Sequence, residues 1–306
     1  MFELLGKTDI DFVGKRRYAF VLSGVLALLG VVTIIQIARG QANTGIDFAG
    51  GTAVQLQFEK PIQLDEARAL LEREGFPDAE LQEFTDGNKL LIRVKKQTTI
   101  EEKVADRLIA VFSAGLSSNP FAVDSTVEIG PTVGAKLQQD AVKAITIAMI
   151  GIMIYIAVRF EVRFGVAAAI ATFHDVLAVL GIVGLMGKEI NLLIVTALLT
   201  LGGYSLTDTV VVFDRIRENL RSRRRDPLQS VINQGINQVL SRTIVVSLTT
   251  LLALMALFFF GGEVIHDFSF ALILGVIIGT YSSIFVASPL LLFWPGAQGK
   301  LLKRTA

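Results

Sequence analysis

The stretch LLIVTALLTLGGYSLTDTVVVF, Leu192–Phe213, is apolar over most of its length but carries one acidic side chain, Asp208. A run of about 20 mainly apolar residues is long enough for an α-helix to cross the hydrocarbon core of a bilayer. An ionised carboxylate in such a helix costs several kcal/mol unless a neighbouring group pairs with it or it takes up a proton. The stretch therefore predicts a transmembrane helix whose acidic group has a partner or a function.

Five further apolar blocks resemble this one, in a chain of 306 residues that is 52% apolar and 19% charged. The predicted spans are Tyr18–Ala38, Ala141–Val158, Phe164–Met186, Leu192–Phe213, Thr243–Phe260 and Phe268–Trp294. The first block is too long for the apolar region of a typical signal peptide, so we interpret it as an uncleaved anchor. The pattern predicts a polytopic α-helical membrane protein with six transmembrane helices.

Basic residues mark one side of this topology. They are concentrated in residues 1–17, 215–242 and 295–306 and in the turn between the second and third spans, whereas the short loops on the other side contain only Lys188. Loops rich in lysine and arginine stay in the cytoplasm. We therefore expect a cytoplasmic N-terminal segment, a cytoplasmic tail and a basic cytoplasmic loop at 215–242. The apolar spacing within this loop predicts an amphipathic helix on the membrane surface.

Residues 39–138 separate the first span from a bundle of the other five, residues 139–294, and this orientation places them outside the cytoplasm. Apolar residues alternate in three stretches, as in half-buried strands, and a turn is predicted at Asp86-Gly87. Two further stretches have a helical stripe, one of which stops at Gly75. The order β-α-β-β-α-β predicts an exported α+β domain with a ferredoxin-like fold.

The position of Asp208 suggests a role in proton transfer. It lies about five residues from the cytoplasmic end of its span, roughly 7 Å inside the hydrocarbon edge, so its side chain should face other helices or a water-filled cavity. Arg242 begins the fifth span at a similar depth. One hypothesis makes Arg242 a counter-ion that competes with a proton for Asp208. The alternatives are a structural hydrogen bond for Asp208 and an ordinary cytoplasmic-side anchor for Arg242.

A second ionisable pair, His174 and Asp175, lies near the middle of the third span. Ionisable groups at bilayer depth often belong to proton relays, and two such groups strengthen that interpretation. The alternative is that the histidine satisfies a structural hydrogen bond in the interior. Asp175 and His174 are therefore further candidates for the relay.

Other kinds of chemistry find little support. The chain has no cysteine and only two histidines, so a thiolate or histidine metal site is not expected. Gly6-Lys7-Thr8 matches the end of a phosphate-binding loop, but Met1 stands where that motif needs glycine. The sequence predicts no enzyme and no cofactor. Any energy source must then be the membrane gradient, with the proton as the coupling ion.

Four segments resemble one family. They are GIDFAGGT (Gly45–Thr52), FHDV (Phe173–Val176), YSLTDTVVVFDRIREN (Tyr204–Asn219) and SRT (Ser241–Thr243). Together they are similar to the SecF branch of the SecD/SecF family, accessory subunits of the Sec translocase within the RND superfamily. In that family, the residues matching Asp208 and Arg242 are held to conduct protons.

The resemblance implies a six-span half of an RND-type assembly, completed by a separate SecD chain in the bacterial plasma (inner) membrane. It further implies that the pair uses the proton-motive force to promote late steps of preprotein translocation through SecYEG and SecA, with no nucleic-acid partner. Two other functions stay open. An RND-like exporter of small molecules or lipids should have a ligand-sized apolar cavity in the exported domain, and a passive translocon scaffold should tolerate changes at Asp208 and Arg242.

Overall fold

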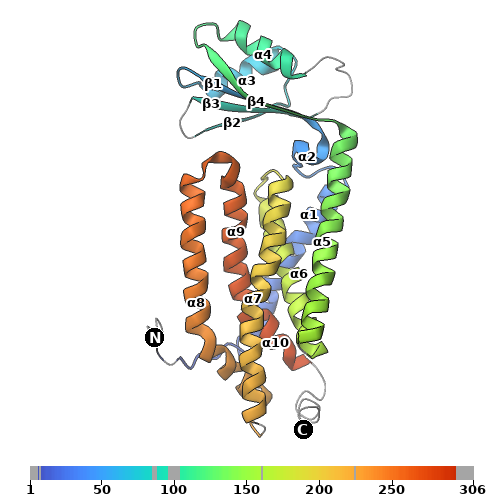
Figure 1. Cartoon of the computed structure of the whole chain (residues 1–306), viewed down its shortest axis with the longest axis vertical. Coiled ribbons are helices and arrows are strands. Elements are labelled where there is room, and N and C mark those ends of the chain that lie inside the picture. Colours follow the sequence, from blue (N-terminus) through green and yellow to red (C-terminus); the bar gives the residue numbers. More distant parts are fainter. Residues whose placement is uncertain are drawn as a thin grey trace.

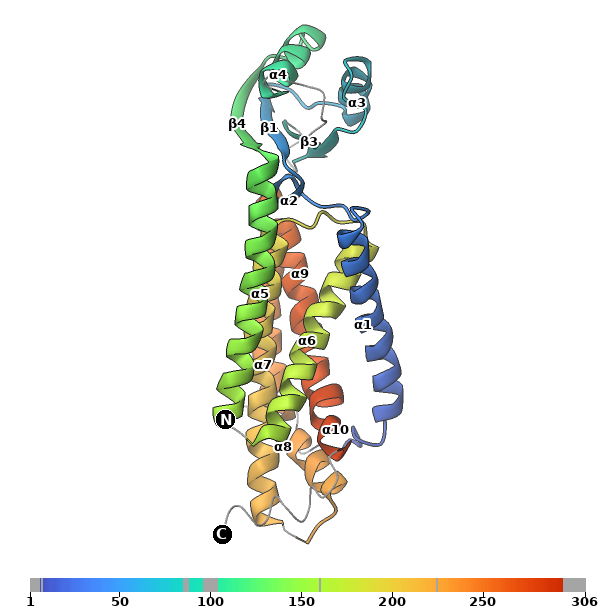
Figure 2. The same cartoon turned by 90° about the vertical axis from the view of Figure 1, so that its right-hand side faces the viewer.

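The computed structural model consists of a long helical bundle with a small α+β domain at one end (Figures 1 and 2). The structure describes residues 6, 8–84, 88–95, 104–159, 161–223 and 225–293. The predicted turn at Asp86-Gly87 and the predicted tail, residues 295–306, lie outside these ranges.

Six helices of the described chain are long and apolar enough to cross a membrane, which confirms the prediction of a polytopic helical protein. They are α1 (Arg16–Ala38), α5 (Pro131–Arg159), α6 (Val162–Leu185), α7 (Leu192–Ser222), α8 (Leu228–Phe260) and α9 (Gly262–Ser282). The last span continues through a π-helical turn (Ser283–Ala287), α10 (Ser288–Leu290) and a 3₁₀ turn (Leu291–Phe293).

The helices divide into inner and outer ones. In the most apolar part of α6, 67% of the residues are buried within the chain, compared with 11% in α5 and 17% in both α1 and α8. Helices α6, α7 and α9 pack against one another. They approach closely where a glycine of one helix faces a side chain of the next. A Cβ atom on Gly275 of α9 would lie 2.7 Å from the Leu201 side chain of α7. Small residues of this kind let membrane helices approach closely.

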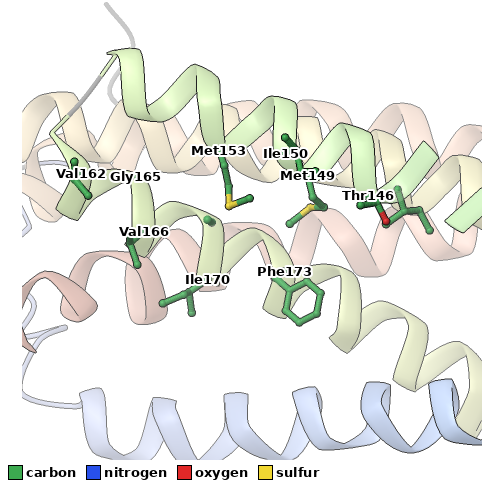
Figure 3. A pocket seen from close by; sticks show the side chains of 11 residues that line it. Thr146, Met149, Ile150, Met153, Val162, Gly165, Val166, Ile170 and Phe173 are labelled. Carbon is green, nitrogen blue, oxygen red and sulfur yellow. The ribbon is translucent and has the colours of Figure 1, made fainter. Parts of the chain in front are cut away.

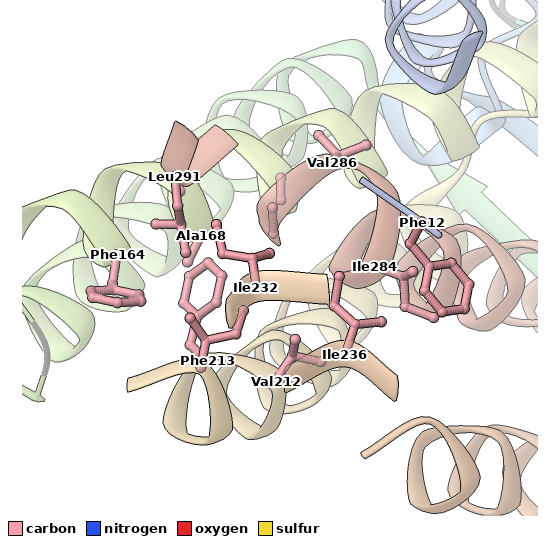
Figure 4. Close-up of a cluster of buried hydrophobic side chains, with 14 of the residues drawn as sticks. Phe12, Phe164, Ala168, Val212, Phe213, Ile232, Ile236, Ile284, Val286 and Leu291 are labelled. Atoms are coloured by element: carbon pink, nitrogen blue, oxygen red, sulfur yellow. The ribbon is translucent and has the colours of Figure 1, made fainter. Parts of the chain in front are cut away.

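The basic segment at 215–242 differs from the predicted loop. Helix α7 continues to Ser222 and α8 begins at Leu228, so most of the segment is helical. The apolar stripe that predicted a helix on the membrane surface is instead buried, with Ile232 and Ile236 fully enclosed. Figure 4 shows these two residues packed against side chains of other elements, including Phe12 and Ile284. Burial of this stripe fixes the start of α8 to the end of the bundle farthest from the α+β domain.

The α+β domain contains, in order, β1 (Gly51–Phe58), α3 (Leu64–Arg73), β2 (Glu80–Glu83), β3 (Lys89–Lys95), α4 (Val104–Gly115) and β4 (Phe121–Ile129). The strands form one antiparallel sheet in the order β2-β3-β1-β4. Alternate side chains of β1 and β3 pack with α3 and α4 in one apolar core, so that the sheet lies between these helices and the bundle (Figure 1). The predicted β-α-β-β-α-β order and the ferredoxin-like fold are confirmed.

Two connections join the domain to the bundle. Helix α1 leads into a short helix, α2 (Ile46–Ala49), directly before β1. Strand β4 passes through Gly130 into α5, which begins at Pro131, where the fixed φ of proline suits the first turn of a helix. Helix α5 therefore starts inside the segment predicted as exported domain (39–138) and runs without interruption along the whole bundle (Figure 2).

Candidate functional site

Asp175 joins three inner helices. Its side chain lies on α6 and is fully buried. Its Oδ2 atom accepts hydrogen bonds from Ser205 Oγ on α7, at 2.5 Å, and from Ser282 Oγ at the end of α9, at 2.6 Å. Its Oδ1 atom lies 2.9 Å from Nδ1 of His174. A carboxylate can accept all of these bonds at once, so the buried acid is satisfied by two serines and a histidine, without a lysine or arginine among the described residues.

His174 has one ring nitrogen in this network and one outside it. Nδ1 interacts with Asp175, whereas Nε2 is buried and has no hydrogen-bond partner within the described chain. When Nδ1 carries the hydrogen that it donates to Asp175, Nε2 is the basic nitrogen of the neutral ring. His174 therefore leaves one ring nitrogen, Nε2, without a hydrogen-bond partner among the described residues.

Asp208 lies on α7, one turn beyond Ser205, and is only half-buried. Its Oδ2 atom accepts a hydrogen bond of 2.7 Å from Ser283 Oγ. Thr243 of α8 is close enough to interact with Asp208, but its buried hydroxyl forms no hydrogen bond of good geometry. Asp208 is thus held by one well-formed bond, and part of its surface faces outward. It is the more accessible of the two acids.

The structure does not bring Arg242 to Asp208. Thr243 points into the bundle, and Arg242, the preceding residue on α8, is exposed. Consecutive residues of an α-helix point about 100° apart, so both cannot face Asp208 in this arrangement. No ion pair joins Arg242 to Asp208 within the part of the chain that is described. The counter-ion role of Arg242 stays a prediction.

The sequence interpretation missed the serines. Ser205, Ser282 and Ser283 provide hydrogen bonds that hold both acids. The signal that identifies them is the pairing of hydroxyl residues with acids inside apolar spans, since a buried carboxylate must find donors. A second set of hydroxyls joins neighbouring helices, with Ser247 of α8 2.6 Å from Thr280 of α9.

An apolar groove of about 670 Å³ lies outside this site, between α5 and α6 (Figure 3). Its walls include Met149 and Met153 of α5 and Val166, Ile170 and Phe173 of α6. No titratable side chain lines it, and no residue of the α+β domain contributes to it. The groove therefore has no part in the chemistry of the two acids.

The segment around Gly45 attaches the α+β domain to the loop between the two acid-bearing helices. Gly45 N donates to Ile190 O at 2.9 Å, and Ile190 N donates to Asn43 O at 2.8 Å. A Cβ atom on Gly45 would lie 2.4 Å from the Glu189 carboxylate, so a larger residue would displace this contact. The loop follows α6 and precedes α7, so these contacts connect both acid-bearing helices to the α+β domain.

An ion pair strengthens the same junction. Arg93 Nη1 of β3 lies 3.1 Å from Glu189 Oε2, with both side chains largely buried. Burial raises the pKa of the Glu189 carboxyl above its usual value, and the Arg93 guanidinium opposes that rise. The ionised form of Glu189 is therefore stabilised by the neighbouring Arg93.

The substitution Arg93→Ala is expected to loosen the junction by about 2–3 kcal/mol, because it leaves a mostly buried carboxylate without its partner. Faster hydrogen exchange at Ile190–Leu192 would report the loss. With the folded pKa of Glu189 raised further above its unfolded value, protection should recover as the pH falls through that raised pKa. Lys89→Ala is the matched control, since Lys89 lies on the same strand but in a more exposed pair with Asp124, worth less than about 1 kcal/mol. Equal effects of the two substitutions would contradict a special role for Arg93.

Comparison with known families agrees with this architecture. Residues 113–297 match the model of the protein export membrane protein SecD/SecF, C-terminal, and residues 43–62 match the SecD/SecF GG motif. The chain belongs to the SecD/SecF family. The GG motif contains the Gly45 segment at the junction, and the larger match contains both acids.

Individual relatives of the SecD/SecF family cover nearly the whole chain. The protein translocase subunit SecF of Thermodesulfovibrio yellowstonii is 51% identical over 306 residues, 99% of this chain and 100% of the relative. The protein of the same name from Escherichia coli O157:H7 is 38% identical, over 94% of this chain and 88% of the relative.

Solved structures of SecDF show the same fold. The crystal structure of SecDF from Thermus thermophilus, described as a translocon-associated membrane protein, matches with a TM-score of 0.81 at 37% identity over 94% of this chain. A SecDF structure in a super-membrane-facing form matches with a TM-score of 0.70. In both cases this chain spans only 39% of the SecDF chain.

Proposed function

We propose that this chain, together with SecD, uses the proton-motive force to promote late steps of preprotein translocation through SecYEG and SecA. The observation that carries the proposal is Asp208, an acid within a membrane span that is half-buried and held by a single serine bond. Acids in such positions are typical of proton pathways. Relatives named as protein translocase subunits support the link to export.

The chain acts in this proposal as a multi-pass protein of the bacterial inner membrane with both termini in the cytoplasm. The basic loops support this orientation, since they gather at the end of the bundle opposite the α+β domain. The α+β domain then lies outside the cytoplasm, where an emerging polypeptide can reach it. No chemical reaction is assigned to the chain, and the proton is its coupling ion.

SecD is expected to cover the outer face of α7. That face carries Thr196, Thr200, Gly203 and Thr207, all exposed within this chain. Membrane helices pack on one another through small and hydroxyl residues, whereas large apolar side chains suit contact with lipid. A partner on this face would complete the assembly of which this chain provides one part.

The mechanism follows from the hydrogen bonds. Protonation of Asp208 removes the charge that Ser283 stabilises, so α7 and α9 can repack against each other. The loop between α6 and α7 passes this movement to the GG segment and from there to the α+β domain. Each charge that crosses the membrane contributes about 2.3 kcal/mol per 100 mV, enough to shift a two-state equilibrium substantially.

The alternative of a small-molecule or lipid exporter is less well supported. Such an exporter would need a ligand-sized cavity in the exported domain, whereas relatives that cover nearly the whole chain are named as protein translocase subunits. The alternative of a passive scaffold makes a different prediction, namely that gradient-driven export tolerates substitution of Asp208.

The test uses vesicles that contain SecYEG, SecD and this chain, with a preprotein halted part-way after SecA and ATP have been removed. Imposing a proton gradient should drive completion of translocation, measured by protection from protease, and a protonophore should prevent it. Vesicles without this chain are the control. Equal completion in the control vesicles, or completion that survives the protonophore, would overturn the proposal.

A further inference from the structure

Two consecutive serines contact the two acids from different sides. Ser282 Oγ donates to Asp175 Oδ2 of α6 at 2.6 Å, and Ser283 Oγ donates to Asp208 Oδ2 of α7 at 2.7 Å. Because the serines share one backbone, a shift of this turn that changes one contact must also change the other. The acids therefore share a mechanical link, which we call the serine bridge (Ser282 and Ser283).

Each hydroxyl of the serine bridge has a choice of acceptor. Ser282 Oγ also lies 3.2 Å from Gly279 O, and Ser283 Oγ lies 3.0 Å from Thr280 O. A hydroxyl has one hydrogen to donate. It turns to the carboxylate when that group is ionised, and it is free to turn to its own helix when the acid carries a proton. Each serine thus has two discrete hydrogen-bonding states that follow the state of its acid.

The backbone at the serine bridge departs from a regular α-helix. The π-helical turn begins at Ser283, and Ser288 Oγ donates to Ser283 O at 2.8 Å. Pro289 follows and has no N–H with which to continue the regular ladder. Single π-turns interrupt α-helices rarely and often at functional sites. The regular helix is therefore interrupted at the point where it meets the two acids, within a turn whose side chains are mostly buried.

The groups facing the two acids come from four helices. Asp175 is met by His174 from its own helix, Ser205 from α7 and Ser282 from α9. Asp208 is met by Ser283 and by Thr243 of α8, and the charges of the two acids are near enough to interact. Neither acid forms an ion pair with lysine or arginine within the described residues. Besides the direct charge interaction, hydroxyl groups are therefore the means by which the state of one acid can affect the other.

We propose that the serine bridge couples the protonation of Asp175 to that of Asp208, and that Asp175 with His174 forms a second proton site. Ser282 and Ser283 are positioning residues in this scheme, since they hold the acids and do not themselves carry the transported proton. The inference rests on the proposed proton-driven function and adds a step to it. Protonation of Asp208, the more accessible acid, changes the hydrogen bonds of the π-helical turn. The changed turn then alters the proton affinity of the enclosed Asp175.

The test measures coupling directly in the complete chain with SecD, reconstituted in lipid vesicles. Infrared absorption of protonated carboxyl groups, followed against pH, gives the proton affinity of Asp175 with and without Asp208→Asn. Allosteric coupling of typical strength would change that affinity by about 5-fold or more. In the Ser282→Ala/Ser283→Ala background, the fold-change in proton affinity caused by Asp208→Asn, here called the coupling factor, should fall to roughly half of its wild-type value or less. Direct charge interaction between the acids accounts for the remainder.

Matched variants separate coupling from packing. Ser269→Ala removes another buried hydroxyl of α9 that has no hydrogen-bond partner, and it should leave the coupling factor unchanged. Ser283→Cys keeps the shape but donates weakly, so its factor should lie between wild type and Ser283→Ala. This isosteric variant also decides the question if the double alanine variant fails to fold.

The outcomes distinguish failure of the serine bridge from failure of the proposed proton-driven export. An unchanged coupling factor in the serine variants overturns the serine bridge while leaving proton-driven export intact. Full gradient-dependent export by Asp208→Asn would instead overturn the proposed function, whatever the coupling. An equal loss of coupling in Ser269→Ala would assign the effect to general packing and also reject the proposal.

Discussion

Asp208→Asn is expected to reduce gradient-driven completion of export to the level of vesicles that lack the chain. Asparagine keeps the size of the side chain and an oxygen that can accept the Ser283 bond, but it cannot take up and release a proton. The substitution should change the stability by less than about 1 kcal/mol, as is usual away from fully buried sites. Membrane insertion and association with SecD, measured by co-purification, should stay normal. The loss is thus confined to use of the gradient.

Asp214→Asn is the matched control for this result. Asp214 lies on the same helix, is half-buried like Asp208, and pairs with Arg159 of α5 at 3.5 Å. The same chemical change six residues away should leave gradient-driven export near the wild-type rate. Retention of export by Asp208→Asn, with Asp214→Asn also active, would favour the passive scaffold. Loss in both variants would point to a general effect of acidic residues on α7.

Parts of this protein could be predicted from the sequence because single segments encode them. An apolar block such as Leu192–Phe213 must be a span, since only a helix satisfies its own backbone in lipid. Val54, Leu56 and Phe58 alternate because one face of β1 is buried, and this local pattern led to the ferredoxin-like fold. Asp208 and Asp175 were also found this way, since an acid in an apolar block is conspicuous by itself.

Other features depend on contacts between distant segments. The stripe at Ile232 and Ile236 has the spacing of either a surface helix or a buried one, and only the presence of Phe12 and Ile284 beside it decides between them. Ser282 is an ordinary residue in a membrane span until α6 places Asp175 opposite it. Arg242 and Thr243 are both polar residues at the start of a predicted span, and which of them faces inward depends on the rotation of α8. These choices belong to packing, which a single segment does not encode.

The glycines around Gly45 show the same limit. Gly50 and Gly51 have φ angles of 75° and 151°, conformations that glycine adopts easily and other residues rarely do. In the sequence, this segment stood out only through its resemblance to the SecD/SecF family. In the structure the segment docks on the loop that joins α6 to α7, and the requirement at Gly45 comes from Glu189, more than a hundred residues away in the sequence.

Asp175→Ala is expected to lower the stability of the bundle by about 3–5 kcal/mol. Ser205 and His174 would each keep a buried polar group without its acceptor, whereas Ser282 can turn to Gly279 O. Every unsatisfied group costs about 1–3 kcal/mol, with incomplete additivity, and the lost side chain adds a packing cost. Unfolding by SDS in mixed micelles, followed by circular dichroism, measures the difference. Asp124→Ala removes an acid of the α+β domain that pairs with Lys89 at the surface, and it should cost less than about 1 kcal/mol.

The contrast between Asp175→Ala and Asp175→Asn separates structure from proton transfer at this position. Asparagine retains one oxygen for the serines, so Asp175→Asn should cost roughly 1–2 kcal/mol, less than the alanine variant. If Asp175 only holds the helices together, export should follow stability and Asp175→Asn should be nearly active at low temperature. If it also carries a proton, Asp175→Asn should lose gradient-driven export while still folded. A stable and fully active Asp175→Ala would contradict both roles, because the buried donors of Ser205 and His174 would then have lost their acceptor without consequence.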